Sequence, residues 1–488
     1  MVGEPACIPF VHCAEYLMGD VTDPVPLSWR DPDGFVVKSQ GRILRAVVSK
    51  KSEQTRMLLR APWMVRFIEE GLVPKTVEVA EPLSCAHRGA TPLWLEHETL
   101  QFPCYPHEIT ALQLYDSALL TLRIAIESAQ QGWILKDASA WNVLHSAGRP
   151  VFVDLLSFER QQPTGEWIAY GQFVRHFVLP LLLYRKLAMT PPEIFLIHRD
   201  GISPERAYQL LRGLDLISAA ALEIVVLPKL LSRSGGRMIA AKRPTAPTAF
   251  DASMGLPLLL RTLHRLHRMV ERLRPDFSKL KSLWGGYEET RSHYSDADLE
   301  VKTAFVRRHL GNCQRVLDLG CNAGEFSLLA AEAGRTVVSA DADDIALSRL
   351  YERIRGKGST VTPIFLNIGR PTPSVGWENR ETESFLDRSV GQFDCVLVLG
   401  LIHHLLVSER ATLDMVVNLL ARLGPKQVIL EWVDPTDPKF QQVAGLNASL
   451  YKDLDSERLE SCMGQKYSLR EKLALPCGTR VMYLWGGR

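Results

Sequence analysis

The stretch Arg315-Val-Leu-Asp-Leu-Gly-Cys-Asn-Ala-Gly-Glu-Phe-Ser-Leu-Leu-Ala-Ala331 decides the fold of the C-terminal part of this chain. An apolar run ends at Asp318, a turn carries Gly320 and Gly324, and a helix is expected from about Glu325. Glycine is needed where the backbone adopts a positive φ, or where a side chain would collide with a ligand lying across the strand end. The stretch therefore predicts a strand, a ligand-binding turn and a helix.

A second apolar run, Thr336-Val-Val-Ser-Ala-Asp341, also ends in an acid. A carboxylate about twenty residues after a glycine turn accepts hydrogen bonds from the hydroxyls of a bound ribose. That spacing fits either NAD or S-adenosylmethionine (SAM). Asp318 favours SAM, because a carboxylate before the turn attracts the cationic amino group of a methionine moiety and repels a pyrophosphate.

A third run, Phe393-Asp-Cys-Val-Leu-Val-Leu-Gly-Leu-Ile-His-His-Leu405, completes the pattern. Together these elements resemble the class I SAM-dependent methyltransferases. In that family the strand corresponding to Cys395 to Leu399 ends beside the transferred methyl group, and a His-His-Leu sequence often follows it. The resemblance implies an α/β fold, with a Rossmann-like parallel sheet in a C-terminal methyltransferase domain.

The resemblance also implies a set of SAM contacts. Four residues would surround the methionine part, and one each would lie beside the ribose, the adenine and the strand end: Asp318, Gly320, Asn322, Gly324, Asp341, Asn367 and Leu399. Two of these positions depart from the family pattern. Asn322 stands where many members have glycine, and Asn367 stands where an aspartate is common.

Four polar residues are candidates for a role in methyl transfer. His403 and His404 follow the strand end nearest the expected methyl group, and either can accept a proton from the acceptor. A core-packing or helix-capping role is an equal alternative for each histidine. Glu431 follows the apolar run Gln427 to Leu430, and Asp434 lies just beyond it; both can orient the acceptor or form a structural salt bridge or turn.

A narrower resemblance rests on four segments: Lys136 to Asn142, Arg370 to Trp377, Leu401 to Leu405 and Glu431 to Pro438. They look like those of a bacterial methyltransferase family that includes the rhizobial nodulation protein NoeA. This resemblance covers most of the chain. It does not fix the substrate.

The N-terminal part carries a different pattern. Asp137 and Asn142 have a D-x-x-x-x-N spacing, and Asp154 follows a β run twelve residues after Asn142. This resembles the catalytic loop and metal-binding aspartate of kinases, in which Asn142 and Asp154 would hold magnesium. However, no Gly-rich loop precedes it, and no V-A-I-K-like strand presents an obvious lysine, although Lys38 and Lys50 lie on or near β-like runs. We therefore expect a kinase-like fold that lacks phosphotransfer.

Hydrophobic periodicity divides the chain into three regions. Residues 1–165 mix β-like runs with an amphipathic helix over Glu108 to Gln131, as expected for a kinase-like α+β region. Residues 166–283 have helical spacing, for example at Leu259, Leu260, Leu263, Leu266 and Val270. Residues 284–488 alternate strands and helices and form the methyltransferase domain.

Composition and charge limit the partners and the location that we expect for the protein. The formal net charge of +2 gives no global reason to expect nucleic acid as a partner. The basic stretch Ser232 to Pro247 can contact phosphates, but a solvated loop is the stronger interpretation. Nine dispersed cysteines, and no basic segment before an apolar run at the N-terminus, favour a cytoplasmic protein. No apolar stretch is long enough to span a membrane.

Three functional hypotheses follow. The first is a bacterial SAM-dependent methyltransferase whose N-terminal region binds or presents the acceptor, with a small molecule or glycan favoured. The second is a bifunctional kinase and methyltransferase. The third is a SAM-binding regulator without catalysis. The acceptor and the oligomeric state do not follow from the sequence.

Overall fold

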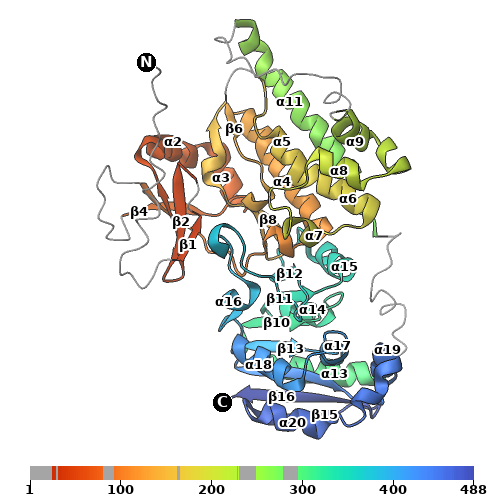
Figure 1. Cartoon of the computed structure of the whole chain (residues 1–488). Helices are drawn as coiled ribbons and strands as arrows, with labels where there is room; N and C mark the ends of the chain where they lie inside the picture. The colour runs from red at the N-terminus through yellow and green to blue at the C-terminus, as the bar shows by residue number, and fades with distance from the viewer. Residues whose placement is uncertain are drawn as a thin grey trace, which may run out of the picture.

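The computed structural model describes residues 25–28, 31–80, 93–161, 165–227, 229, 249–277 and 295–488. The basic stretch at 232–247, the domain boundary near Trp284, the N-terminal segment before residue 25 and three of the nine cysteines lie outside these ranges. In Figure 1 the chain forms an upper N-terminal part and a lower C-terminal part that lie one against the other.

The N-terminal part begins with a five-stranded antiparallel sheet in the order β1-β2-β3-β5-β4. Its strands are β1 Val25–Ser28, β2 Gly34–Ser39, β3 Arg42–Val47, β4 Thr76–Val79 and β5 Leu93–His97. Two helices, α2 Ser49–Arg60 and α3 Pro62–Glu69, connect β3 to β4. Strands β2, β3 and β5 contain the β-like runs that the sequence pattern predicts at 35–37, 43–48 and 93–95, except that β3 ends at Val47.

A helical region packs beside that sheet, around the long central helix α4, Ala111–Ala129. The sequence predicts this helix from Glu108, but Thr110 and Gln113 form a capping box that starts it later, and Pro106–Glu108 make a separate 3-10 turn, η1. Two short hairpin-like pairs flank it: β6 Trp133–Leu135 with β9 Phe158–Arg160, and β7 Val143–Ser146 with β8 Arg149–Phe152.

The remaining helices of this part include α5 Tyr170–Phe173, α6 Leu179–Leu187, α7 Pro191–Phe195, α8 Pro204–Leu210, α9 Ala219–Ala221 and α11 Ala249–Arg272. Helix α11 lies along α4, and the predicted apolar positions Leu259, Leu263, Leu266 and Val270 are buried. Leu260 is half-buried at the edge of this contact. The helical periodicity of α11 is thus confirmed.

The C-terminal part contains a seven-stranded sheet in the order β12-β11-β10-β13-β14-β16-β15. Its strands are β10 Arg315–Leu319, β11 Thr336–Asp341, β12 Val361–Phe365, β13 Cys395–Val398, β14 Gln427–Val433, β15 Tyr467–Ala474 and β16 Arg480–Gly487. The first five strands in the order are parallel, as predicted, while β16 and β15 pair antiparallel at one edge, so the sheet is mixed.

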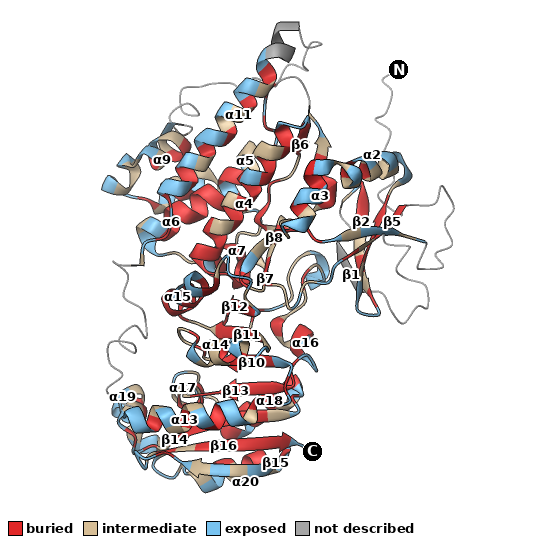
Figure 2. Cartoon of the chain, turned by 180° about the vertical axis from the view of Figure 1, so that it is seen from behind, coloured by how far each residue is buried: buried red, intermediate tan, exposed pale blue. Residues whose placement is uncertain are grey.

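Helices cover this sheet, whose central strands are buried (Figure 2). They are α13 Asp296–His309, α14 Glu325–Glu332, α15 Asp344–Ile354, α16 Phe385–Ser389, α17 Ile402–Val407, α18 Leu413–Leu423, α19 Pro438–Ala444 and α20 Ser456–Gly464. The strand order reverses between β10 and β13, because the chain continues outward from β10 to β12 before returning. In open α/β sheets, ligands bind outside the carboxyl ends of the strands at such a switch point.

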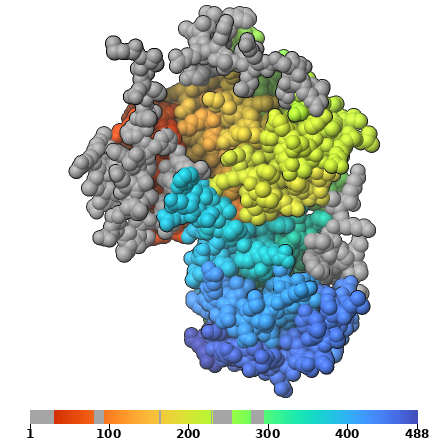
Figure 3. Space-filling model, viewed as in Figure 1, coloured from red at the N-terminus to blue at the C-terminus, as the bar shows by residue number. Residues whose placement is uncertain are grey.

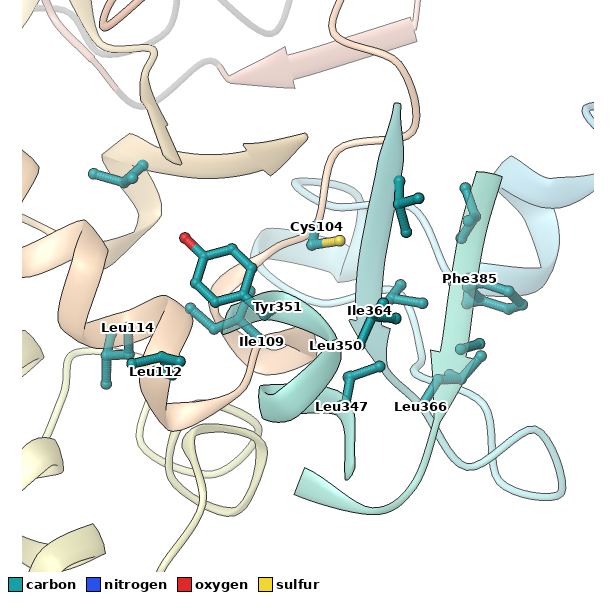
Figure 4. Close-up of a cluster of buried hydrophobic side chains, with 14 of the residues drawn as sticks. Cys104, Ile109, Leu112, Leu114, Leu347, Leu350, Tyr351, Ile364, Leu366 and Phe385 are labelled. Atoms are coloured by element: carbon teal, nitrogen blue, oxygen red, sulfur yellow. The ribbon is translucent and has the colours of Figure 1, made fainter. Parts of the chain in front are cut away.

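The two parts share one apolar core. Leu112 and Leu114 of α4 and Ile109 lie toward Leu347 and Leu350 of α15 (Figure 4), within the same cluster of buried residues. Polar contacts reinforce the junction, since the carbonyl of Pro363 in β12 accepts a hydrogen bond from the Gln113 side chain at 3.2 Å.

The segment at 370–384 extends this junction along the N-terminal part, as the cyan surface in Figure 3 shows. Glu381 pairs with Arg199, and Glu383 lies 3.8 Å from the ammonium of Lys38 in β2.

Candidate functional site

A cavity of about 340 Å³ opens at the carboxyl ends of β10, β11, β12 and β13. It is lined by most of the residues that the sequence analysis selected as SAM contacts, and by one of the two histidines: Asp318, Gly320, Asn322, Asp341, Asn367, Leu399 and His404. Gly324, His403 and Glu431 do not line it. Four strands thus bring residues from 318 to 404 to one place at the switch point.

The turn after β10 is held by backbone conformation and by packing. Gly320 and Gly324 have φ values of 73° and 77°. A Cβ on Gly324 would lie 2.4 Å from the side chain of Leu350, and one on Gly320 would lie 3.1 Å from that of Leu401. Asn322 also has a positive φ, 50°, which asparagine tolerates better than most residues. The glycines are therefore required by neighbouring protein side chains as well as by conformation.

Asp318 lies at the end of β10, buried beneath the turn. Its carboxylate accepts a hydrogen bond from the Ser327 hydroxyl at 2.6 Å, and Ser327 in turn accepts one from Ser339. Burial raises the pKa of Asp318 to about 6, although Ser327 and the nearby ammonium of Lys302 oppose this. A buried carboxylate of this kind favours a cationic ligand, which restores its charged form.

Asp341 ends the neighbouring strand β11. Its two carboxylate oxygens accept hydrogen bonds from the backbone N–H groups of Asn322, at 2.7 Å, and Asp343, at 2.8 Å. Burial raises the pKa of Asp341 to about 6 as well, despite these bonds. Asp341, the residue expected to bind the ribose, is therefore hydrogen-bonded directly to the glycine turn.

Asn367 lies after β12 at the rim of the cavity. Its side-chain amide donates to Glu409 at 2.8 Å, and Glu409 also pairs with Arg370 at 2.9 Å. Glu409 lines the cavity too, and the sequence analysis missed it because it lies after α17, away from any motif. At this point the rim of the cavity consists of the Asn367 amide hydrogen-bonded to the Glu409 carboxylate.

The two histidines of α17 have different surroundings. His404 lines the cavity, and burial lowers its pKa to about 4. His403 is 4% exposed, and its ring lies 6.3 Å from that of Phe440 on α19. Burial lowers the pKa of His403 as well. Near pH 7 both rings are therefore neutral, and only His404 reaches the cavity.

Glu431 lies inside β14 and not at its end, because the strand continues to Val433 in pairing with β16. The carboxylate is fully buried, 2.7 Å from the ammonium of Lys302 and 3.2 Å from the guanidinium of Arg480. These two cations make a charged residue tolerable within a buried strand. Asp434 forms a turn, in which its carboxylate accepts from Thr436.

Lys302 is a cavity residue that the sequence analysis missed. It lies on α13 between Leu299 and Phe305, so a lysine interrupts the buried face of an amphipathic helix. That interruption was a usable signal, because lysine is rarely buried without a partner.

The kinase-like residues also come together, in the N-terminal part. The amide of Asn142 donates to Asp154 at 3.5 Å, and Arg45 of β3 lies 3.3 Å from the same carboxylate. Burial, followed by the charge of Asp154, raises the pKa of Asp137. Within the described ranges, no group of three or more His, Cys, Asp or Glu side chains is arranged to hold a metal ion.

The fold, the glycine turn and the acid-lined cavity agree with the methyltransferase domain that the sequence predicts. In agreement, residues 262–470 match the family model described as a methyltransferase domain. The C-terminal part of the chain is therefore similar to methyltransferase domains.

Over nearly its whole length the chain is similar to the nodulation protein NoeA of Rhizobium meliloti (strain 1021). The two are 28% identical over 467 residues, which cover 93% of this chain and 94% of that protein. The resemblance that the sequence segments indicate is thus confirmed.

Among solved structures, the bifunctional kinase-methyltransferase WbdD aligns with a TM-score of 0.30 and 22% identity, over 43% of this chain and 44% of that chain, which is less than half its length. The N-methyltransferase NodS from Bradyrhizobium japonicum WM9 aligns with a TM-score of 0.29 and 12% identity, over 40% of this chain and 98% of that one. Magnesium protoporphyrin IX methyltransferase from Synechocystis PCC 6803, with bound SAM, gives a TM-score of 0.29 and 14% identity, over 43% and 91%.

No helix among the described residues has both the length and the apolar character needed to cross a membrane.

Proposed function

We propose that this chain binds SAM in the C-terminal cavity and transfers its methyl group to an acceptor that is a small molecule or a glycan. The observation that supports this most strongly is the pair of carboxylates at the switch point of the sheet, the buried Asp318 and the half-buried Asp341. Both pKa values are raised to about 6, so a cationic ligand is favoured there and a pyrophosphate is opposed.

The residues present fit SAM. Gly320 adds no side chain to the cavity wall at the turn. Asp318 is suited to the methionine ammonium, Asp341 to the ribose hydroxyls, and Asn367 with Glu409 to the adenine edge. When bound, SAM supplies an electrophilic methyl group on a sulfonium. The chain holds that group and the acceptor in line, which contributes much of the rate in displacement reactions. His404, neutral near pH 7, is placed to accept the acceptor's proton.

The cytoplasm is the proposed location, because it supplies SAM and keeps thiols reduced. All six cysteines within the described ranges are free. The similarity to a nodulation protein gives a reason to search first among small molecules and glycans of bacterial origin.

A labelling experiment tests this proposal. The purified chain is incubated with methyl-labelled SAM and a size-fractionated cell extract, and the Asp341→Ala variant serves as the control. We expect label in a small compound or glycan, with a mass gain of one methyl group. Label in protein or RNA would contradict the acceptor class, and SAM binding without any labelled product would favour the regulator hypothesis.

A bifunctional kinase and methyltransferase is less well supported, because the cluster that would carry phosphotransfer is already paired internally. Asp154, which would bind magnesium, interacts with Arg45 through one oxygen and with Ser157 and Asn142 through the other.

A further inference from the structure

A buried ammonium lies in the wall of the cavity. Lys302 of α13 is 4% exposed, and its Nζ lies 4.9 Å from the centroid of the Phe326 ring, which also lines the cavity. Burying an ammonium is costly unless anions compensate it. A buried cation in a ligand cavity is therefore held there by specific partners.

Those partners form a network of alternating positive and negative side chains that leads away from the cavity. The Lys302 ammonium lies 2.7 Å from Glu431, Glu431 lies 3.2 Å from Arg480, and Arg480 lies 2.9 Å from Asp437. All four side chains are at most 5% exposed, and of the four only Lys302 lines the cavity. This network places an anion beside the Lys302 ammonium and limits where that ammonium can point.

The methionine part of SAM presents two charges on one carbon atom, an ammonium and a carboxylate. Asp318 accounts for the ammonium, and Lys302 is close enough to Asp318 to influence its carboxylate. Of the lysine and arginine side chains that line the cavity, the other is Arg353, which is exposed on α15 and donates to the carbonyl of Ala323. Lys302 is the buried cation on the Asp318 side.

We infer that Lys302 binds the α-carboxylate of the methionine part of SAM, and that Glu431 and Arg480 act as positioning residues for its ammonium. The inference rests on the proposed function and deepens it. It also assigns Glu431 a role different from contact with the acceptor.

Calorimetry with SAM and with decarboxylated SAM tests the inference, because the two ligands differ in the carboxylate. The wild-type chain should bind SAM about tenfold or more tightly than decarboxylated SAM, the difference expected for a hydrogen bond between charged groups. Lys302→Gln should remove that preference and leave the affinity for decarboxylated SAM nearly unchanged. Glu431→Gln should reduce the preference, while the matched control Arg353→Gln should retain it.

Several outcomes would overturn the inference. The affinities of the wild-type chain for SAM and decarboxylated SAM are a test by themselves, so a variant that fails to fold does not prevent it. Equal affinities for the two ligands refute the carboxylate contact. Loss of the preference in Arg353→Gln instead of Lys302→Gln assigns the contact to the exposed cation. A Lys302→Gln variant that binds SAM normally but has a raised KM for the acceptor assigns Lys302 to the acceptor. Absence of SAM binding by the wild-type chain refutes the proposed function itself.

Discussion

The hydroxyl of Tyr184 donates a 2.6 Å hydrogen bond to the carboxylate of Asp344, and so joins α6 of the N-terminal part to the first turn of α15 in the methyltransferase sheet. The other oxygen of Asp344 accepts from the backbone N–H of Ala111, at the start of α4. Asp344 follows directly on Asp343, whose N–H binds the ribose candidate Asp341. The N-terminal part therefore supports the loop that carries a predicted SAM contact.

Removing the Tyr184 hydroxyl should weaken this support. In Tyr184→Phe the buried Asp344 carboxylate loses a donor, so its pKa, already raised to about 6 by burial, should rise further. We expect the free energy of unfolding to fall by about 2 kcal/mol, the usual cost of an unsatisfied buried acceptor. Denaturant unfolding measures this change. Tyr208→Phe, on a half-buried tyrosine of α8, is the control and should change stability by less than about 0.5 kcal/mol.

The ribose assignment leads to a second prediction. Asp341→Ala should weaken SAM binding by about 100-fold, because two hydrogen bonds to a charged acceptor are lost. Isothermal titration calorimetry measures the affinity, and a thermal melt confirms that the variant is folded. Asp453→Ala removes an exposed acid elsewhere and should bind SAM normally. Retained affinity in Asp341→Ala would exclude the ribose contact.

The pH dependence of SAM binding follows from the two raised carboxylate pKa values. Asp318 and Asp341 titrate at about 6 in the free protein, and a cationic ligand binds their charged forms. Affinity should be highest near pH 7 and should fall as the pH decreases through 6, by roughly tenfold at pH 5 if one proton must be lost. Titrations at pH 5, 6 and 7.5 measure this. Equal affinity at pH 5 and pH 7.5 would contradict the prediction.

The sequence predicted those features of the molecule whose residues lie close together in the chain. The strands around Asp318 and Asp341 are short apolar runs ending in an acid, and the parallel order brings their ends together without further information. Lys302 and Glu431 were not predicted as a pair, because they are 129 residues apart in the chain and meet only when α13 packs against the sheet. Arg45 and Asp154, 109 residues apart, are the equivalent case in the N-terminal part. Motif spacing describes single elements, whereas these contacts depend on how elements pack.

Because His403 and His404 have different surroundings, we expect them to have different roles. His404→Ala should lower kcat by about tenfold or more while leaving SAM affinity nearly unchanged, because His404 lines the cavity on the expected methyl side. His403→Ala should lower stability, because that ring packs against Phe440. Since the pKa of His404 is lowered to about 4, the profile of kcat against pH should show no histidine inflection between pH 6 and 7. Unchanged turnover in both single variants and in the double variant would remove both residues from catalysis.

The last prediction concerns the kinase-like cluster, in which Arg45 is placed where a metal ion would have to bind. Its guanidinium contacts Asp154 at 3.3 Å, the carbonyl of Val153 at 3.1 Å and the His97 ring at 3.1 Å. A magnesium ion requires carboxylate oxygens with open coordination positions. Binding would therefore require Arg45 to leave three partners and would place two cations beside one carboxylate. We expect no magnesium-dependent phosphotransfer.

Two measurements check this expectation. Incubation with labelled ATP and magnesium should give no autophosphorylation or phosphate release above the background, and magnesium should not shift the melting temperature. Asp154→Ala should instead lower the stability, by about 2 kcal/mol, because it leaves Arg45 without its anion in a mostly buried site. Arg45→Met, which removes the cation, should give a similar loss. ATP-dependent phosphate release that Asp154→Ala abolishes would establish phosphotransfer and restore the bifunctional hypothesis.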